Sequence, residues 1–491
     1  MKNNLCLIIL LALLGACRQT QVPANFQTVK RDAPIYPDYT GVTIPVNMAP
    51  LNFELLAPAD DAVTRFSAGG NELVCGGLKV RPDIDEWRLL TAAARGGNIS
   101  VEVFAKKDDQ WVRFTPYTIY VSPDSIDPYL SYRMISPSYV SYEELTINQR
   151  CLETFDEQVI ADNMLCSTEA GGQCINCHSY QQWTPDRMQL HARHAHGGTV
   201  IAYDGQVTKN TSQPTPVYPA WHPSLKLIAY STNKTLQTFH TADLNKIEVI
   251  DAESDLLLYD IDKRQMTVIE QQPDELETFP CWSPDGRWLY FASAHFEYPA
   301  DTVDMSEITL RAQEVKYNLY RKSFNPDTRE LGPRELVLAA DTMGMSATLP
   351  RLSPDGRFLM FTMAAWGNFH IWHRDADLWL MDLSGEGRIR PLSELNSDDT
   401  ESYHSWSSNG RWVVFSSRRT DGIFTRPFIA HIDAEGKASK PFELPQADPD
   451  RHRQLLKSYN VPEFMRGPVT ITPQQAADIL KSGGTETTKQ Q

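Results

Sequence analysis

The sequence predicts a mainly β chain in which a small antiparallel β-sandwich precedes a β-propeller of five or six blades. Two observations lead to this fold class. Four copies of a turn motif between apolar runs occur in the second half, and apolar runs alternate with turns between residues 48 and 121. A repeated β unit cannot bury both of its faces alone, so the copies have to stack on one another.

The first residues predict export from the cytoplasm. Lys2 precedes the apolar run Leu5–Leu14, which is too short to span a bilayer as a mature helix. We therefore assign residues 1–16 as a lipoprotein signal peptide.

Cys17 follows two small residues, as in the cleavage site of a bacterial lipoprotein, and is the predicted lipidation site. Ordinary secretory cleavage is the alternative. Residues 17–45 are rich in Gln, Pro, Thr and Val and are predicted to form a tether. Because no acidic run follows Cys17, we expect an outer membrane lipoprotein of the cell envelope that faces the periplasm, anchored to the membrane by its lipid.

The composition restricts the class of partner. A chain of 491 residues is long enough for two or three domains, and its net charge of −16 argues against binding to nucleic acid or to an anionic membrane surface. The expected partners are therefore envelope proteins or a redox partner.

Residues 46–125 form the predicted β-sandwich domain. Runs such as Asn98–Phe104 and Trp111–Phe114 are separated by turn residues. Short strands that alternate with turns are typical of a small antiparallel sandwich.

Residues 126–196 are predicted to be a helical or loop segment, with a helix-like polar stretch from 142 to 160. The segment contains Cys174-Ile175-Asn176-Cys177-His178, and C-x-x-C-H is typical of covalent haem c attachment. Cys174 and Cys177 would form thioethers to the porphyrin, and His178 would ligate the iron. A zinc site or a redox-active disulfide could use the same C-x-x-C spacing.

Four residues after His178 are candidates for the sixth iron ligand. Met188 is favoured, and His191, His194 and His196 stay open. A thioether ligand raises the reduction potential relative to a second histidine, so this choice sets the redox role. An open iron face, with His191 or His194 as an acid–base residue, would instead favour a peroxidase-like enzyme.

Four further cysteines lie in the exported chain, at positions 75, 151, 166 and 281. Cys151 and Cys166 flank a short loop beside the haem motif, so a disulfide between them is conceivable in an oxidising compartment. The sequence alone leaves the connectivity open.

Residues 197–447 carry the four repeats, whose anchor residues are Trp221, Trp282, Leu352 and Trp406. In three of them the anchor precedes Ser-Pro-Asp-Gly or Ser-Ser-Asn-Gly, in which glycine supplies the positive φ of a tight turn. The pattern resembles the W-S-P-D-G-x-x-L-x-F repeat of TolB-like, WD40-like propellers.

Taken with the lipoprotein signal and the C-x-x-C-H motif, the chain resembles TolB-like propeller lipoproteins with a cytochrome-type motif from Gram-negative anaerobes. The resemblance implies an envelope-anchored c-type haem protein for electron transfer or redox-linked protein interaction. A TolB-like scaffold without haem is the alternative, and we lean against an enzyme.

Two other regions are candidates for chemistry. Arg418 and Arg419, after the fourth hairpin, could bind an anionic partner, although a solvated turn is the simpler interpretation. Residues 368–375, with Glu401 and His404 of the next repeat, could bind a metal, although blade packing is the simpler interpretation. The sequence has no G-x-S-x-G, so a hydrolase of the prolyl oligopeptidase type is not supported. Residues 448–491 form a predicted C-terminal tail with one helix at Pro473–Leu480.

Overall fold

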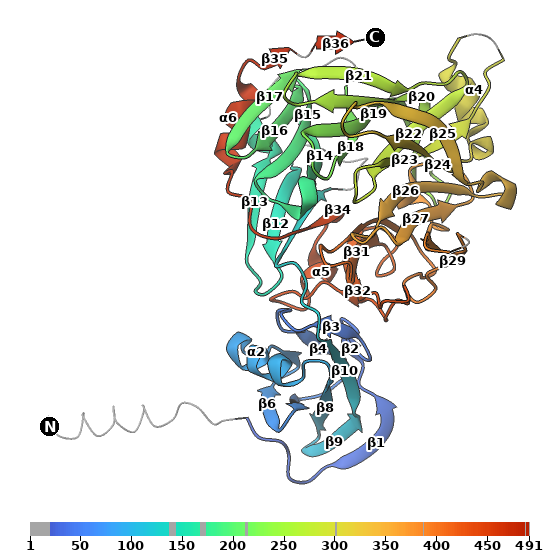
Figure 1. Ribbon diagram of the computed structural model, residues 1–491. Coiled ribbons are helices and arrows are strands. Elements are labelled where there is room, and N and C mark those ends of the chain that lie inside the picture. Colours follow the sequence, from blue (N-terminus) through green and yellow to red (C-terminus); the bar gives the residue numbers. More distant parts are fainter. Residues whose placement is uncertain are drawn as a thin grey trace, which may run out of the picture. The chain divides into compact units, whose positions relative to one another are not determined.

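The computed structural model describes residues 20–136, 144–166, 173–211, 215–299, 302–385, 387–486 and 488–490. The predicted signal peptide and Cys17 therefore lie outside the described residues. The chain divides into two compact units, which are considered separately (Figure 1). The first unit comprises the described residues up to Val42, together with Ala49–Pro123 and Pro445–Arg451, and the second comprises Thr43–Met48, Asp124–Leu444 and His452–Gln491.

The first unit contains two sheets and one helix. One sheet has the order β1-β9-β8-β10, with β5 between β8 and β6, and a second small sheet has the order β2-β4-β7. Its elements are β1 (Gln27–Asp32), β2 (Ile35–Tyr36), β4 (Phe53–Leu55), β5 (Asp61–Ala68), β6 (Asn71–Gly76), β7 (Lys79–Val80), α2 (Ile84–Ala93), β8 (Asn98–Lys107), β9 (Gln110–Thr115) and β10 (Tyr117–Ser122).

Helix α2 was not expected from the sequence. Asp83 caps it by accepting hydrogen bonds from the backbone N–H groups of Asp85 and Glu86. Its Trp87 is fully buried against Phe66 of β5, with ring centroids 5.7 Å apart. The helix therefore covers a face of the larger sheet.

The prediction that residues 17–45 form only a tether is wrong from Gln27 onward. Strand β1 pairs in parallel with β9, and β2 pairs with β4. Most of the β1 side chains are exposed. An edge strand of this kind gains its stability from backbone hydrogen bonds, so its side chains show no apolar alternation.

The second unit is built from antiparallel strands that succeed one another in chain order. The first group of its strands is β3 (Thr43–Pro45), β11 (Tyr129–Ile135), β12 (Thr146–Cys151), β13 (Glu157–Asp162), β14 (Gln173–Tyr180), β15 (Arg187–His194), β16 (Gly198–Tyr203), β17 (Gln206–Thr211), β18 (Val217–Trp221), β19 (Leu227–Phe239), β20 (Ile247–Asp260) and β21 (Gln265–Glu270).

The second group completes the strands of this unit. These strands are β22 (Glu275–Trp282), β23 (Trp288–His295), β24 (Asn318–Phe324), β25 (Leu331–Leu338), β26 (Ser346–Leu352), β27 (Phe358–Ala364), β28 (Asp377–Asp382), β29 (Ile389–Pro391), β30 (Glu401–Trp406), β31 (Trp412–Ser417), β32 (Arg426–His431), β33 (Phe442–Glu443), β34 (Ser458–Met465), β35 (Thr485–Glu486) and β36 (Thr488–Gln490).

Short helices connect these strands. They are α3 (Asn163–Cys166), α4 (Met305–Leu310), α5 (Arg451–Gln454), α6 (Pro473–Lys481), and the 3-10 turns η1 (Gln181–Trp183), η2 (Ala312–Glu314), η3 (Asp341–Met343) and η4 (His370–Trp372).

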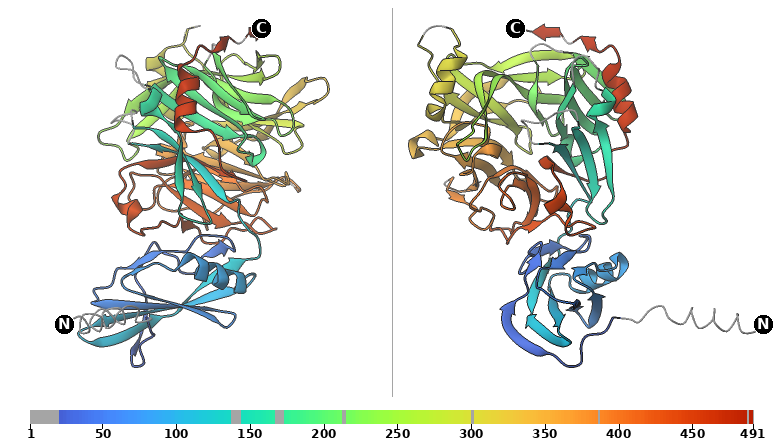
Figure 2. Two further views of the ribbon diagram at one scale, coloured as in Figure 1. Left: turned by 90° about the vertical axis from the view of Figure 1, so that its left-hand side faces the viewer. Right: turned by 180° about the vertical axis from the view of Figure 1, so that it is seen from behind.

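Four sheets of this unit consist of four antiparallel strands or contain such a set, and in three of them these strands are consecutive in the chain. Their orders are β13-β12-β11-β34, β14-β15-β16-β17, β26-β27-β28-β29 and β30-β31-β32-β33. Between the second and third of these, β18 to β21 and β22 to β25 form two further meanders, which a single bridge from Ser254 to Leu276 joins. Within this unit the sheets follow one another around a centre, as Figure 1 and the right-hand view of Figure 2 show.

The expectation of a helical or loop segment at 126–196 is wrong, because these residues form the strands β11 to β15. Buried polar side chains interrupt the apolar alternation that would have indicated these strands. Asn148 and Gln149 of β12 are buried, with Asn148 donating to Glu157 and Gln149 donating to the carbonyl of Val469. Buried polar groups that are hydrogen-bonded fit a strand without producing apolar alternation.

The C-terminal region contributes more than the expected helix. The helix prediction is confirmed by α6, whose Ala476, Ala477 and Leu480 are buried. Strand β34 was not expected, and it pairs antiparallel with β11, the first strand of its sheet. Residues more than 300 positions apart in the chain therefore share one sheet.

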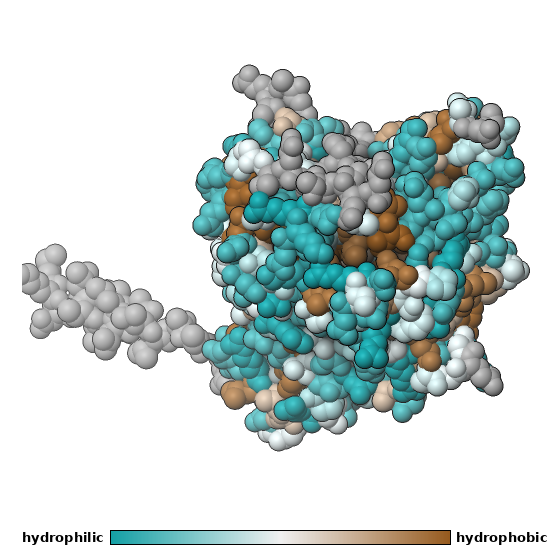
Figure 3. All heavy atoms as spheres, turned by 45° about the horizontal axis from the view of Figure 1, so that its top comes forward, coloured by the Kyte–Doolittle hydropathy of each residue, from teal (hydrophilic) through white to brown (hydrophobic). Residues whose placement is uncertain are grey.

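The described residues contain no helix that is long and apolar enough to cross a membrane. In the face shown in Figure 3, most surface residues are hydrophilic, with smaller apolar areas between them. Such a surface agrees with the acidic composition of the chain.

Candidate functional site: an axial cavity in the second unit

The innermost strands of the second unit share an irregularity at one position. Register shifts occur in β18, β22, β26 and β30 about three residues before the anchor residue of each repeat. The residue at each shift has a positive φ, a conformation that costs energy for a residue other than glycine. These residues are Tyr218, Phe279, Leu349 and Tyr403, and Val461 of β34 has the same conformation.

The residue after each of these positive-φ positions is Pro, except in β30, where it is His404. Strand β14 has its register shift between Asn176 and Ser179, over Cys177 and His178. The segment Cys177-His178-Ser179-Tyr180 therefore occupies the place of Tyr218-Pro-Ala-Trp221. Cys177 and His178 of the C-x-x-C-H motif thus lie at the same β-bulge, the shared register shift, that the repeats carry.

Anchor tryptophans link neighbouring sheets through their indole N–H groups. Trp282 donates to the carbonyl of Ala220 at 3.2 Å, and Trp406 donates to the carbonyl of Arg351 at 3.2 Å. Each accepting residue directly precedes the anchor residue of the adjacent sheet. Each such hydrogen bond therefore fixes one inner strand against the next.

The bulged strands enclose a cavity of about 310 Å³. Its walls come from the bulged strands β14, β18, β26, β30 and β34, from the neighbouring strands β11, β15, β19 and β20, and from the turn η4, whereas β22 contributes none of the described lining residues. A narrower cavity of about 170 Å³ is lined by Trp221, Trp282, Leu352 and Trp406 among others. Ser179, Pro219, Arg351 and Glu463 line both cavities. We call the larger space the axial cavity.

His178 lies in the wall of the axial cavity and is 2% exposed. Burial and the nearby Arg133 lower the pKa of its imidazole to about 3, although a hydrogen bond to the backbone of Val461 acts to raise it. Its Nε2 has no hydrogen-bond partner among the described residues. A neutral imidazole with a free nitrogen is the form that ligates metals.

Cys174 lines the same cavity, four residues before His178. It is a buried free thiol, and its Sγ accepts a hydrogen bond from Asn176 Nδ2 at 2.9 Å. The side chain of Cys177 lies outside the described part of the structure. The donor set described here, one thiol and one neutral imidazole facing one cavity, is compatible with haem attachment.

The candidate sixth ligands differ in whether they face the axial cavity. Met188 is 2% exposed and packs in an apolar cluster with Ile175 and Leu190, and it is not among the residues lining the axial cavity. His191 Nδ1 lies 2.9 Å from Thr199 Oγ1. Of the four candidates, His194 is the one that lines the axial cavity.

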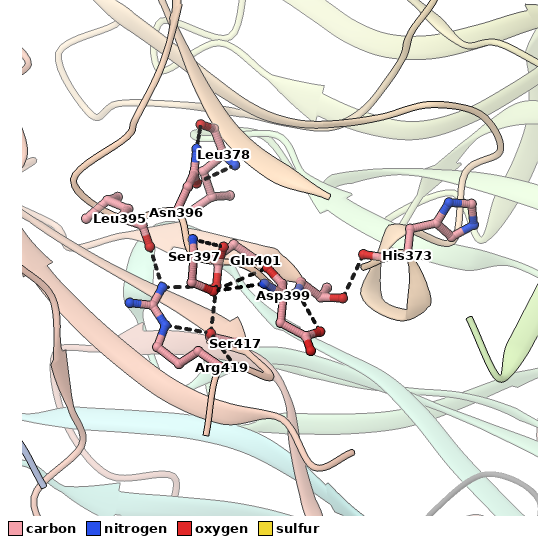
Figure 4. Close-up of polar contacts among 10 residues, drawn as sticks. His373, Leu378, Leu395, Asn396, Ser397, Asp399, Glu401, Ser417 and Arg419 are labelled. Carbon is pink, nitrogen blue, oxygen red and sulfur yellow. Dashed lines mark hydrogen bonds and ion pairs between the residues drawn. The ribbon is translucent and has the colours of Figure 1, made fainter. Parts of the chain in front are cut away.

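The second histidine cluster is used for packing and hydrogen bonding. His373 Nε2 lies 2.7 Å from Glu248 Oε2, and His370 Nδ1 lies 2.9 Å from Thr348 Oγ1. Glu401 accepts hydrogen bonds from Ser397 and Ser417 and pairs with Arg419, as Figure 4 shows. Within the described ranges, no group of three His, Cys, Asp or Glu residues is arranged to hold a metal ion.

Cys151 and Cys166 do not form the disulfide that the sequence left open. Both are free thiols, at the ends of β12 and α3. Burial raises the pKa of Cys166 to about 11, which disfavours its reactive thiolate form.

The most important residues that sequence reasoning missed are the arginines Arg133, Arg193 and Arg351. Together with Arg418 they line the axial cavity, and they come from three different sheets and from the segment after β31. No local pattern marks them, because the fold alone brings them together. The bulge, in contrast, could have been found by aligning Cys177-His178-Ser179-Tyr180 with the repeats.

Comparison with known proteins adds little to this picture. No family model matches the chain. An uncharacterized protein of Agrobacterium fabrum is 28% identical over 187 residues, which cover 34% of this chain and 59% of that protein. The match therefore spans less than two thirds of the relative's length.

Solved structures give only distant similarities. A hypothetical selenium-binding protein from Sulfolobus tokodaii has a TM-score of 0.41 and 8% identity, over 71% of this chain and 95% of that chain. Prolyl oligopeptidase B from Galerina marginata has a TM-score of 0.35 and 10% identity, over 86% of this chain and 54% of that chain. TM-scores at this level assign neither fold nor activity.

Proposed function

We propose that the second unit is a six-bladed β-propeller of the TolB-like type. Six inner strands support this count, because β14, β18, β22, β26, β30 and β34 all carry the same bulge. The long sheet from β18 to β25 counts as two blades, since one bridge joins its halves. Strand β34 completes the blade of β11 to β13 from the C-terminal side.

We further propose that the protein is an envelope-anchored c-type haem propeller, lipidated at Cys17, that serves electron transfer or redox-linked protein interaction. The observation that carries this proposal is the free Nε2 of the buried His178 in the cavity that Cys174 also lines. Cys174 and Cys177 would hold the porphyrin, and His178 would ligate the iron. A haem bound there would supply one-electron transfer.

The surroundings of the candidate residues favour one of them as the sixth ligand of the iron. His194, which lines the cavity, is a better placed sixth ligand than Met188, which packs in an apolar cluster. A second histidine would give a lower reduction potential than a thioether. The redox role then shifts toward the low-potential range of c-type centres.

A haem stain on a denaturing gel tests attachment. The wild type and the Cys174→Ala/Cys177→Ala variant are expressed in an exporting host with cytochrome c maturation machinery, with Cys75→Ala as a matched control. We expect haem to survive denaturation in the wild type and in Cys75→Ala, and to be absent from the double variant. An exported wild type without haem, beside a maturing control cytochrome, would refute the proposal.

A second candidate function is a ligand-binding scaffold at the envelope without haem. It is favoured by the bulge, since His178 occupies the position that Pro219, Pro280, Pro350 and Pro462 occupy elsewhere. In this case the histidine is a variant of a repeated structural residue.

His178→Pro distinguishes the two candidates. If the position is only structural, the variant should fold, retain a thermal midpoint close to that of the wild type, and leave binding to other envelope proteins unchanged. If His178 ligates haem, the variant should lose the spectrum of a six-coordinate iron even where haem remains attached. His404→Pro, at the same position of β30, is the matched control.

A further inference from the structure

The axial cavity has a charge opposite to that of the chain as a whole. Four arginines line it, and Glu463 is the one acidic residue among the described lining residues. The chain carries a net charge of −16. A concave site of one sign in a low-dielectric wall concentrates ligands of the opposite sign.

None of the four arginines forms an ion pair with a carboxylate within the part of the chain that the structure describes. Arg133 donates to the side-chain oxygen of Asn176, and its Nε has no partner there. Arg351 donates to the carbonyl of Pro350 at 3.1 Å. These guanidinium groups therefore keep unused donors.

Arg418 is the most deeply buried of the four, at 5% exposure. Its guanidinium carbon lies 3.3 Å from the ring centroid of Trp372, and its Nε has no partner among the described residues. Burial lowers its pKa to about 9, and Asp399 and Asp421 act in the opposite direction without forming an ion pair with it. A buried guanidinium with a free donor is costly unless a ligand completes its hydrogen bonds.

The remaining wall suits an organic ligand rather than a simple ion. Phe369, Trp372 and Ile371 line the cavity together with the side chains of Tyr218 and Tyr403. Asn460 is 8% exposed and its Oδ1 has no partner in the described residues. A few polar groups that converge within an apolar wall are typical of small-molecule sites, and the cavity volume is at the lower end of their range.

We propose that the axial cavity is a binding site for a ring-bearing organic carboxylate, with Arg351, Arg418 and Arg193 as the groups that hold the carboxylate. Guanidinium groups match the planar geometry of a carboxylate and can bind it through two parallel hydrogen bonds. The aromatic wall holds the ring of the ligand. This inference does not depend on haem attachment and holds for either candidate function.

Two kinds of ligand could supply a carboxylate attached to a ring. One is the pair of propionates of a porphyrin, and the other is a free acid such as a uronic acid. Both require the arginines, so the test uses one probe for each source. An iron-free porphyrin tests carboxylate recognition without any contribution from iron ligation by His178.

The experiment measures binding to the full chain purified from a host without maturation machinery, and so free of haem. The probes are protoporphyrin IX, its dimethyl ester and galacturonate, followed by tryptophan fluorescence and calorimetry. The variants are Arg193→Ala and Arg418→Gln. Arg187→Ala is the matched control, because Arg187 lies on the same strand as Arg193 but pairs with Asp204.

We expect one of the two acids to bind, and Arg193→Ala and Arg418→Gln each to raise its dissociation constant about tenfold or more, while Arg187→Ala leaves it unchanged. Binding of protoporphyrin IX but not of its ester identifies the porphyrin source. Binding of galacturonate alone identifies a free acid.

Three results overturn the proposal: binding of neither acid, equal binding of protoporphyrin IX and its ester without binding of galacturonate, or binding that Arg193→Ala leaves unchanged. Arg193 is exposed at the surface of the unit, so its variant folds even if Arg418→Gln does not. Failure of the haem stain leaves this result unaffected, because no haem is present in the experiment.

Discussion

At the scale of single residues, Glu463 is the acidic counterpart of the arginines in the axial cavity. It lies where the two cavities meet, together with Arg351. Burial raises its pKa to about 7, although Arg351 and a hydrogen bond to the backbone of Tyr180 act to lower it. Near neutral pH, its ionisation therefore changes the charge of the cavity wall.

The raised pKa predicts a pH dependence of folding stability. The folded state favours the protonated carboxyl, so this contribution is complete below pH 4.5, the ordinary pKa of Glu, and is lost as the pH rises through about 7. Glu463→Gln removes the titration. We therefore expect its thermal midpoint, relative to that of the wild type, to be higher at pH 8 than at pH 5.

Thermal unfolding at the two pH values checks this prediction, with Glu253→Gln as the control. Glu253 is exposed and pairs with Lys234, so its variant should show the same difference from the wild type at both pH values. If the midpoint of Glu463→Gln instead falls relative to the wild type as the pH rises, the electrostatic attraction of Arg351 outweighs burial.

At the scale of the repeated elements, the anchor residue of β26 breaks the series of indole hydrogen bonds. Leu352 takes the place of tryptophan and lies with Cys281 in the wall of the narrower cavity, which holds about 170 Å³. By the pattern of Trp282 and Trp406, a tryptophan at 352 would donate to the carbonyl of Cys281. We expect Leu352→Trp to stabilise the contact between the two sheets.

Leu352→Phe is the matched variant, since it fills the same space without an N–H donor. The net contribution of one hydrogen bond is about 1 kcal/mol. Leu352→Trp should therefore exceed Leu352→Phe by about that amount in the free energy of unfolding, measured by urea denaturation. Equal stability of the two variants would show that the indole does not reach the carbonyl.

The same elements show what the sequence could reveal. Anchors at Trp282, Leu352 and Trp406 marked three of the inner strands, because a turn motif that ends in glycine follows each one. The strands β11 and β12 were missed, since their inward positions carry hydrogen-bonded polar residues such as Gln149. The arginine-lined cavity could not be predicted either, because its arginines lie in three sheets and one connecting segment that only the tertiary fold brings together.

At the scale of the whole second unit, β34 joins the end of the chain to its beginning. It pairs with β11 from Tyr129 opposite Met465 to Ile135 opposite Ser458. Tyr459, Phe464 and Met465 are buried to 1% exposure or less, and the ring of Tyr459 lies 4.7 Å from that of Tyr132. A series of sheets around a centre leaves two open ends unless such a strand joins them.

This closure predicts different outcomes for two truncations. A chain that ends at Lys457 lacks β34 with its three large buried side chains, each worth about 1.5–3 kcal/mol, as well as α6. That loss is comparable with the whole stability of many domains, about 5–15 kcal/mol, so we expect no cooperative unfolding transition of this unit. A chain that ends at Thr470 keeps β34 and lacks only α6 and the residues after it.

The longer chain should therefore unfold cooperatively, at a lower temperature than the wild type, because the buried Ala476, Ala477 and Leu480 of α6 are absent. Differential scanning calorimetry of the two truncated chains checks the prediction. If the chain ending at Lys457 still unfolds in a cooperative transition with the enthalpy of the longer one, the strand is an addition to the sheet rather than its closure. If the chain ending at Thr470 instead loses its cooperative unfolding transition, α6 is the element that holds the two ends of the series of sheets together. It would do so through its contacts with β16 and β17.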